Sequence, residues 1–328
     1  MSAENYVNND NTNLAPRTSF DGPKLAFDFP ALRIGVAEYE EGPTGCTVFH
    51  FPDGVSTVVD ERGGAVGAAG TDYGWHHAIC FAGGSLFGLE VIAGVRAELL
   101  AQQQYRIDWE TIPLVGGAII WDWRFRDNAV YPDKALGRAA LRSAVAGSFP
   151  LGPRGAGRSA SVGKWLLPPH QGESAGQGAA CFQAGPTKVL VFTVVNAVGG
   201  IIDREGNAVR GHYNPETGKR DRADVYANLD ALVGYLGEPS NGNTTLTLIV
   251  TNRKLQRAQQ LARQVHSSMA RAIYPFHTHS DGDILFVATT NELENPEMDE
   301  TLLSHIASEL AWDSVLCCFE SHETQRDD

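Results

Sequence analysis

Apolar residues recur at intervals of three and four in two stretches near the end of the chain, the spacing that lines one face of an α-helix. The first stretch is residues 255–273, and the second is residues 299–316, with Asp299 near its start. The repeating residues are Leu255, Ala258, Ala262, Val265, Met269 and Ala272 in the first, and Leu303, Ile306 and Leu310 in the second. Both stretches are therefore predicted to be helices with one buried face.

Two more helices are predicted earlier in the chain. Residues 83–104 open with Gly83, Gly84 and Ser85 and carry little charge in their first half, which indicates a helix that is covered on most sides. Residues 132–145 begin with proline, a residue that is favoured in the first turn of a helix.

Strands are predicted between these helices. Residues 187–199 are apolar on both faces, as expected for a strand in the middle of a layered structure. Shorter apolar runs predict strands at residues 114–123, 245–251 and 283–290. Residues 201–213 have the pattern of a hairpin that turns at its Glu-Gly pair.

The order of these elements predicts the fold class. Strands flanked by helices at both ends of the chain indicate two packed sheets with helices outside them, a single-domain, four-layer αββα sandwich. A doubly wound Rossmann-type sheet is the alternative, but no G-x-G-x-x-G follows an early strand. Residues 214–243 are mostly polar apart from a short helical pattern in "YANLDALVGYL". A loop of this length in a compact domain is typical of a functional or a disordered segment.

Composition narrows the class of protein. The chain of 328 residues is 43% hydrophobic and 20% charged, which is enough for a sizeable core. Its net charge of −13 argues against nucleic acid or an anionic membrane surface as a partner. The longest apolar run, residues 189–202, is too short to span a bilayer.

The first residues of the chain and the cysteines bear on the cellular location of the protein. Residues 1–26 are polar and rich in asparagine, so we expect a tail that is disordered or held by a partner subunit. This stretch lacks the apolar centre of a signal peptide. The five cysteines follow no disulfide pattern and are predicted to be buried, unpaired thiols. A cytoplasmic location is the simplest prediction.

Asn243 and Thr244 join the polar segment to the predicted strand that follows it. A threonine hydroxyl is a poor nucleophile at neutral pH unless a base lies close by. If the peptide bond before Thr244 is cut, the new α-amino group titrates near pH ~8 and lies within reach of the hydroxyl. One residue then supplies both the nucleophile and the base. The alternative is a strand that simply begins with threonine.

The stretch "FHTHSDGD" (276–283) is the second candidate. His277, His279, Asp281 and Asp283 alternate, so an extended chain would place all four on one side. Such a set could hold zinc or iron, which makes a metal-dependent hydrolase using His277, His279 and Asp281 one alternative. A polar turn, or two carboxylates that orient an amine and a lysine, are the others.

Lys164 and Asn196 are the remaining candidates. Lys164 ends "GRSASVGK", a run of small residues that lets the chain approach a ligand closely. The run is not a phosphate-binding loop, because Arg158 replaces its first glycine and Trp165 follows the lysine. A solvated surface lysine is the alternative. Asn196 is an amide in an apolar strand and is either a structural crosslink or an oxyanion donor.

Several segments resemble the 6-aminohexanoate-oligomer endohydrolases, the nylon-oligomer-degrading enzymes within the aminopeptidase family of self-cleaving N-terminal-nucleophile hydrolases. They include "HHAICFAGGSLFGLEVIAGV" (76–95), "VVNAVGGIIDREGNAVRGHYNPETG" (194–218), "GNTTLTLIVTN" (242–252) and "QVHSSMARAIYPFHTHSDGDILFVATT" (264–290). The resemblance covers residues 27–318, and its Gly-Asn-Thr-Thr and Asp-Gly-Asp stretches are specific to the family.

The resemblance implies an αββα sandwich that cuts itself between Asn243 and Thr244. The products would be a larger fragment, residues 27–243 with the tail before it, and a smaller fragment, residues 244–328, of the same domain. It also implies a homo-oligomer of cleaved protomers, which we expect to be a tetramer. No cofactor or metal is expected.

The resemblance also implies roles for the other candidates. Thr244 would be the nucleophile and the new N-terminus, Asn196 an oxyanion-hole donor, and Lys164 a group that positions or polarises its neighbours. Asp281 and Asp283 would orient the lysine and the α-amine.

The sequence departs from the family pattern at Trp121. The family has an active-site tyrosine in a pattern like "AVIYDF", whereas this chain reads "AIIWDW". An indole N–H donates a hydrogen bond but cannot accept one or titrate as a phenol does. We therefore expect Trp121 to contact substrate and to alter the substrate preference and the oxyanion geometry.

The expected activity is endo-type hydrolysis of linear and cyclic 6-aminohexanoate oligomers. An aminopeptidase or amidase that acts on short peptides or amino-acid amides is the first alternative, and the metal-dependent hydrolase is the second. A non-catalytic binding protein, which would never be cut, is the third.

Overall fold

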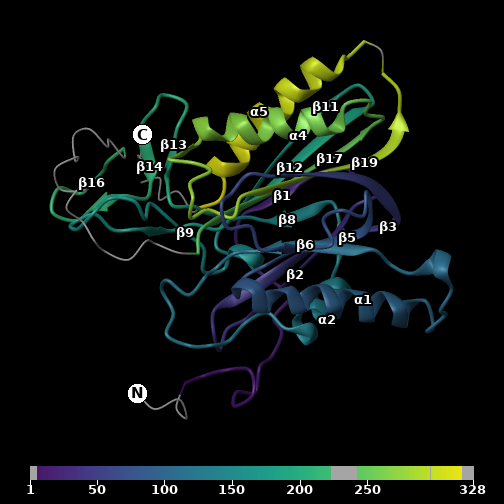
Figure 1. Cartoon of the computed structure of the whole chain (residues 1–328), viewed down its shortest axis with the longest axis horizontal. Helices are drawn as coiled ribbons and strands as arrows, with labels where there is room; N and C mark the ends of the chain where they lie inside the picture. The colour runs from purple at the N-terminus through teal and green to yellow at the C-terminus, as the bar shows by residue number, and fades with distance from the viewer. Residues whose placement is uncertain (1–5, 223–241, 296, 320–328) are drawn as a thin grey trace.

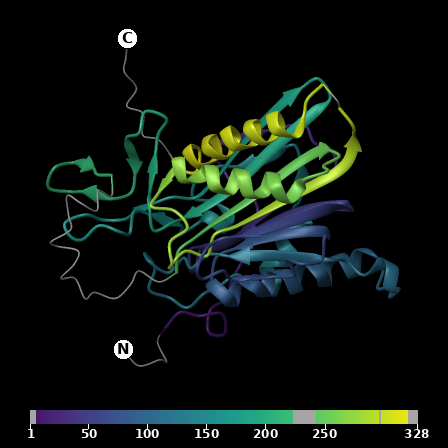
Figure 2. The same cartoon turned by 45° about the horizontal axis from the view of Figure 1, so that its top comes forward.

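Helices cover the two outer faces of a pair of packed sheets (Figure 1 and Figure 2). The structure, a computed structural model, describes residues 6–222, 242–295 and 297–319. One outer face carries α4 (Ala258–Ser268) and α5 (Glu300–Leu316), and the other carries α1 (Glu90–Gln102) and α2 (Lys134–Arg142). The predicted four-layer αββα sandwich is confirmed, and the doubly wound alternative is wrong.

The first sheet layer has the strand order β11–β12–β17–β19–β3. Its members are β11 (Gln177–Ala184), β12 (Thr187–Asn196), β17 (Thr244–Arg253), β19 (Ile284–Leu293) and the second half of β3 (Thr44–Glu61). The strands β17 and β19 are parallel, and the other pairs in this layer are antiparallel.

The second layer is built on the first half of β3. Its members are β2 (Arg33–Tyr39), β5 (Trp75–Ala82), β6 (Val115–Ile119), β4 (Ala68–Ala69) and β7 (Val145–Ala146). The pairing of β3 with β5 shifts between His50 and Val55, where Pro52 and Gly54 stand. Proline removes a ladder donor and glycine tolerates a bend, so one strand passes from one layer into the other.

Short elements complete the described chain. They are β1 (Lys24–Ala26), η2 (Ser85–Leu89), η3 (Trp109–Thr111), β8 (Ser148–Pro150), η4 (Gly155–Gly157), β9 (Ser161–Val162), β10 (Glu173–Ser174), β13 (Gly200–Ile202), β14 (Ala208–Arg210), β15 (Tyr213–Asn214), β16 (Lys219–Arg220), η5 (Met269–Arg271) and β18 (Ile273–Tyr274). The predicted hairpin is confirmed as β13 and β14, which turn at Gly206 with φ +90°.

The core lies on both faces of the strands. In β12, Leu190, Phe192 and Val194 point between the two sheets, whereas Val191 and Val195 pack under α4 and α5. The Phe192 ring lies 5.1 Å from that of Phe49 on β3, centroid to centroid. This arrangement confirms the prediction from the apolar pattern of residues 187–199, because a strand between two apolar layers needs apolar residues on both faces.

Two predicted elements differ from the structure for local reasons. The helix predicted over residues 83–104 begins with the tighter η2, where a Cβ on Gly88 would lie 1.9 Å from the carbonyl oxygen of Gly83. The strand predicted over residues 114–123 ends at Ile119 because Asp122 turns inward. The Asp122 carboxylate accepts hydrogen bonds from Thr44 Oγ1 and Arg126 Nη2, each at 2.5 Å.

The helix predicted over residues 255–273 is also shorter. It consists of α4 and one 3-10 turn, η5, and then the chain enters β18, which pairs with β13. The other predicted helices and strands agree with the structure to within a few residues at each end. The helical pattern "YANLDALVGYL" lies outside the described residues.

Residues 6–26, assigned to a tail from composition, lie against their own chain. The side chain of Asn9 accepts a hydrogen bond from Tyr131 N and donates one to Tyr131 O, at 3.0 and 3.1 Å. Further along, β1 pairs with β8. None of the helices in the described ranges is long and apolar enough to cross a bilayer. All five cysteines are free, but only Cys46, Cys80 and Cys318 are buried, so the prediction of buried thiols is wrong for the other two.

Candidate active site

The predicted site residues meet where three strand ends converge. Thr244, the first residue of β17, pairs directly with Asn196, the last residue of β12. Because β17 and β19 are parallel, their starting ends also lie side by side, and Asn243 forms a bridge with Asp281. Strand pairing therefore brings together residues from three distant parts of the sequence.

Two hydrogen bonds reach the carbonyl oxygen of the peptide bond between Asn243 and Thr244. The Thr244 hydroxyl donates a hydrogen bond to the carbonyl oxygen of Asn243, with an O···O distance of 2.5 Å. The backbone N–H of Gly282 donates to the same oxygen at 2.7 Å. Thr244 is only 4% exposed. A buried hydroxyl thus lies against the carbonyl group that a self-cleaving threonine would attack.

Gly282 is a site residue that the sequence analysis missed. A Cβ at this position would lie 2.7 Å from Thr244 Oγ1 and 2.6 Å from the carbonyl oxygen of Ala65. Only glycine leaves room for the hydroxyl and lets its own N–H approach the carbonyl oxygen of Asn243. A glycine between two candidate carboxylates in Asp-Gly-Asp was the available signal.

Asn196 is fully buried, and both the nitrogen and the oxygen of its side-chain amide form hydrogen bonds. Its Nδ2 donates to the carbonyl oxygens of Trp121 at 2.9 Å and Gly242 at 3.1 Å. Its Oδ1 accepts from Ser161 N at 3.0 Å. The amide donors therefore hold the carbonyl group one residue before Asn243, while the Gly282 N–H holds that of Asn243.

Lys164 lies beside Asn196 and is not a solvated surface lysine. Its Nζ donates to Asn196 O at 3.0 Å and to Asn196 Oδ1 at 3.2 Å. Burial of the amine and the nearby Arg124 guanidinium lower the pKa of Lys164 to about 7, although Asp281 acts in the opposite direction. A lysine with this pKa is partly unprotonated at neutral pH and can accept a proton.

The two carboxylates are fully buried and have different partners. Asp281 Oδ2 accepts from the N–H and the hydroxyl of Thr278 at 2.9 and 2.6 Å. Burial, and then the charge of Asp283, raise the pKa of Asp281. Asp283 Oδ1 accepts from Thr245 N at 2.7 Å, and its Oδ2 lies 2.9 Å from His277 Nδ1. Asp283 therefore contacts the residue next to the candidate nucleophile.

Of the alternatives for residues 276–283, the polar turn agrees with the structure, and the extended arrangement that would place all four side chains on one side is wrong. Asp281 N bonds back to Thr278 O at 3.1 Å, so the chain turns here and its side chains point in different directions. His277 contacts Asp283, whereas His279 is exposed. Within the described residues no group of three or more His, Cys, Asp and Glu side chains is arranged to hold a metal ion. This geometry does not support His277, His279 and Asp281 as a ligand set.

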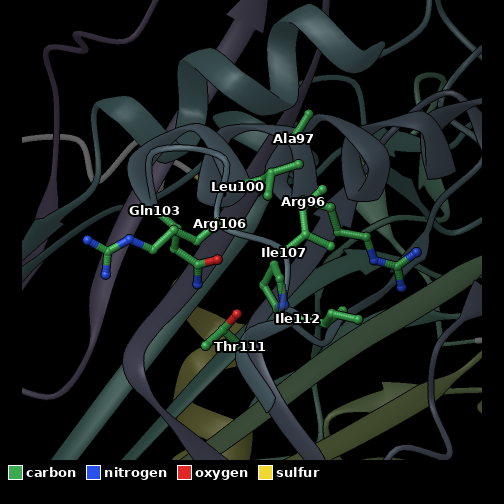
Figure 3. A pocket seen from close by; sticks show the side chains of 9 residues that line it. Arg96, Ala97, Leu100, Gln103, Arg106, Ile107, Thr111 and Ile112 are labelled. Carbon is green, nitrogen blue, oxygen red and sulfur yellow. The ribbon is translucent and has the colours of Figure 1, made fainter. Parts of the chain in front are cut away.

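Trp121 connects the site to a cavity of about 690 Å³. A Cβ on Gly242 would lie 2.5 Å from Trp121 Cγ, so the indole packs on the backbone just before the Asn243–Thr244 bond. The cavity is lined by Tyr6, Asn8, Asn9, Asp10, Phe87, Trp121, Trp123, Arg126, Asn128, Ala129 and Tyr131. A smaller cavity of about 270 Å³ lies at the end of α1, between Leu100 and Ile112, and includes none of the predicted site residues (Figure 3).

Comparison with known proteins identifies the family. The sequence profile of Peptidase family S58 matches residues 26–321. The chain belongs to peptidase family S58. A 6-aminohexanoate-oligomer endohydrolase of Agromyces sp. (strain KY5R) is 48% identical over 323 residues, which cover 94% of this chain and 89% of the relative. This S58 member is an amide-bond hydrolase, and the prediction of an enzyme is confirmed.

Solved structures agree with the fold. The structure of a Burkholderia sp. beta-aminopeptidase matches with a TM-score of 0.61 at 16% identity, covering 90% of this chain and 88% of that one. An L-aminopeptidase D-Ala-esterase/amidase from Ochrobactrum anthropi, described as a variant of the Ntn hydrolase fold, matches with a TM-score of 0.61 at 13% identity. That match covers 92% of this chain and 88% of the other.

Proposed function

We propose that this S58 member is made as one inactive chain, cuts itself between Asn243 and Thr244, and then hydrolyses amides with Thr244 as the nucleophile. One observation carries the proposal: the Thr244 hydroxyl and the Gly282 N–H both contact the carbonyl oxygen of Asn243. That geometry suits attack by the hydroxyl and stabilisation of the oxyanion that follows.

Self-cleavage starts with loss of the hydroxyl proton. The Lys164 amine accepts this proton, and Thr244 Oγ1 forms a bond to the carbonyl carbon of Asn243. The negative charge on the carbonyl oxygen is stabilised by the Gly282 N–H. The carbon–nitrogen bond then breaks, and the nitrogen takes the proton from Lys164 and becomes the α-amine of Thr244. Water hydrolyses the resulting ester, which releases the Asn243 carboxylate and restores the hydroxyl.

Turnover uses the same hydroxyl with a different base. The new α-amine of Thr244, with a pKa near ~8, accepts the hydroxyl proton as the oxygen attacks a substrate amide. The leaving amine takes that proton, and water then hydrolyses the acyl-enzyme ester. Asp281 and Asp283 orient the lysine and the α-amine. Once the carbonyl of Gly242 has moved away, the Asn196 amide can join Gly282 as an oxyanion donor.

The proposed substrates are linear and cyclic 6-aminohexanoate oligomers, cut within the chain. The relatives at 48% identity carry that activity in their name, which supports this substrate class. An aminopeptidase acting on short peptides is the competing proposal, and it requires a free amine at the end of the substrate. Trp121, in place of the expected tyrosine, lies where it can change the preference between such substrates.

A gel assay and a hydrolysis assay test the proposal together. We expect the wild-type protein to yield a small fragment beginning Thr-Thr-Leu-Thr and the Thr244→Ala variant to remain uncut and inactive. Thr245→Val is the matched control, because the buried Thr245 hydroxyl has no hydrogen-bond partner among the residues that the structure describes. An uncut Thr244→Ala chain that still hydrolyses oligomers would contradict the proposal.

A second assay separates the two substrate classes. Cyclic oligomers and oligomers with an acetylated amine have no free amino end, so an endohydrolase should cut them and an aminopeptidase should not. Activity that is confined to free-amine substrates would favour the aminopeptidase. Loss of activity with a chelator, in a chain that is never cut, would favour metal-dependent hydrolysis.

We further propose that the cleaved chains form a homo-oligomer, a tetramer, in the cytoplasm. The exposed side chains of Ile107 and Trp109, at 81% and 89% exposure, offer apolar surface that association would cover. Five unpaired thiols suit a reducing compartment. Light scattering on the cut and uncut protein measures the assembly, and a monomeric cut protein would contradict it.

A further inference from the structure

In the proposed self-cleavage the uncut chain is the substrate, so the residues just before Thr244 show where the acyl part of a later substrate lies. In any transfer to Thr244, the carbonyl of Asn243 stands in for the substrate carbonyl. The residue before it, Gly242, therefore occupies the position of the acyl chain. Gly242 packs directly on the indole of Trp121. An acyl chain attached to Thr244 is thus expected to run toward Trp121.

Trp121 also forms part of the wall of the 690 Å³ cavity. Aromatic side chains form much of this wall: they are Tyr6, Phe87, Trp121, Trp123 and Tyr131. Flat aromatic walls provide apolar surface for an unbranched methylene chain, and they also attract a cation. The cavity is large enough for a small ligand with a few polar groups.

One side of the cavity comes from the start of the chain. Tyr6, Asn8, Asn9 and Asp10 all line it. The segment is held in place by Asn9, whose side chain bonds to both backbone polar groups of Tyr131, and by the bond from Ala129 N to Val7 O at 2.7 Å. Residues 6–10 are therefore a fixed wall attached to the loop after β6.

The charged side chains around the cavity differ in whether an opposite charge already pairs with them. The Arg126 guanidinium is neutralised by Asp122, with an Nη2–Oδ1 distance of 2.5 Å, and stacks over the Trp123 ring. The Asp10 carboxylate is exposed and has no cationic partner among the described residues. The rim of the cavity therefore offers an unpaired negative charge beside aromatic surface, which suits a positively charged end group.

We propose that this cavity binds the acyl side of linear substrates, an unbranched aliphatic chain ending in an ammonium group, and that residues 6–10 form a specificity-determining wall. The inference rests on the proposed function, because it takes Thr244 as the acceptor of the acyl group. Tyr6 packs against the methylene chain, and Asp10 pairs with the ammonium end.

Two adjacent residues make a matched test. Tyr6 and Val7 are each 41% exposed, but only Tyr6 lines the cavity. We expect Tyr6→Ala to raise KM for amino-ended 6-aminohexanoate oligomers about tenfold, with kcat and self-cleavage unchanged. Val7→Ala should leave KM as in the wild type. Equal KM values for the two variants would overturn the proposal.

Asp10→Asn tests the charged end separately. We expect this variant to reduce the preference for amino-ended over N-acetylated oligomers about tenfold, because only the amino-ended substrate carries the ammonium. An equal loss for both substrates would contradict the pairing. Failure of the proposed function would look different: the wild-type protein would remain uncut or would hydrolyse neither substrate.

Discussion

The ends of β12, β17 and β19 and the loop after β6 hold their functional groups in different ways. At the strand ends, Asn196, Asp281 and Asp283 are each fully buried, and each accepts or donates hydrogen bonds to neighbouring backbone groups. Around the loop, Trp121 is part-buried and Asp10 is exposed. The first region holds the side chains of Asn196, Asp281 and Asp283 in place with hydrogen bonds, whereas the second offers a broad, partly exposed surface.

This difference matches what each region is proposed to do. Bond breaking needs its groups held to within a fraction of an ångström, and paired strand ends supply that rigidity. Recognition of a chain needs surface and a few charges, which loops on a rigid scaffold can provide and vary. The departure from the family pattern, Trp121, lies in the second region. Variants at the strand ends should therefore lower kcat or the self-cleavage rate, and variants around the loop after β6 should change KM.

The largest effect is expected for Lys164→Arg. Arginine stays protonated at any accessible pH, so the proton acceptor is lost and self-cleavage should slow by about 10²- to 10⁴-fold. In the wild type, the pKa of about 7 means that the unprotonated amine becomes more abundant as pH rises through 7. The self-cleavage rate of freshly refolded protein should rise over the same range and be flat in the variant. A rising profile in Lys164→Arg would exclude this lysine as the base.

Gly282→Ala should come next. Its Cβ would overlap the Thr244 hydroxyl, and the shift that relieves this contact moves the N–H away from Asn243 O. Loss of one oxyanion donor costs about 10²- to 10³-fold in rate, so the chain should remain largely uncut on a gel. The uncut Thr244→Ala protein is the comparison for stability. Normal cleavage in Gly282→Ala would show that the contact has no role in the reaction.

A smaller effect is expected for His277→Ala, with His279→Ala as the matched control. His277 contacts the buried Asp283, and removal of a hydrogen bond to a charged group costs roughly 2 kcal/mol of stability. We expect a lower melting temperature and a reduced kcat for His277→Ala. His279 is exposed, so its variant should behave as the wild type. Equal losses in both variants would instead favour the metal alternative.

The smallest effect is expected for Trp121→Tyr. The bond from Asn196 goes to the backbone carbonyl of Trp121, so the substitution leaves that contact in place. Self-cleavage should be unchanged, and KM should change by a few-fold between short and long oligomers. Steady-state kinetics with oligomers of defined length make the comparison. A chain that fails to cut itself would show that the indole belongs to the catalytic region.

Much of the fold follows from apolar patterns, but β3 does not. Its Pro-Asp-Gly, residues 52–54, has the composition of a turn, yet the strand continues after it because the residues on either side pair with distant strands. The structure of the N-terminal residues also could not be predicted from their own composition. Their composition indicates a tail, yet Asn9 is anchored by Tyr131, a partner more than a hundred positions away.

The site residues that could be predicted are those with reactive side chains. The structure brings together Thr244, Asn196, Lys164, Asp281 and Asp283. Gly282 was missed because it acts through a backbone N–H, which every residue has. The turn at residues 278–281 was one of the alternatives for this stretch, but alternation could not select it, because the turn depends on hydrogen bonds between Thr278 and Asp281.

The most direct measurement is the intact mass of both chains, trapped in acid during turnover of a 6-aminohexanoyl ester. We expect a small chain beginning at Thr244 that carries one acyl group, and a larger chain without one. An acyl group on the larger chain, or a single uncut chain of 35.4 kDa that turns over the ester, would contradict the assignment of Thr244 as both the cleavage site and the nucleophile.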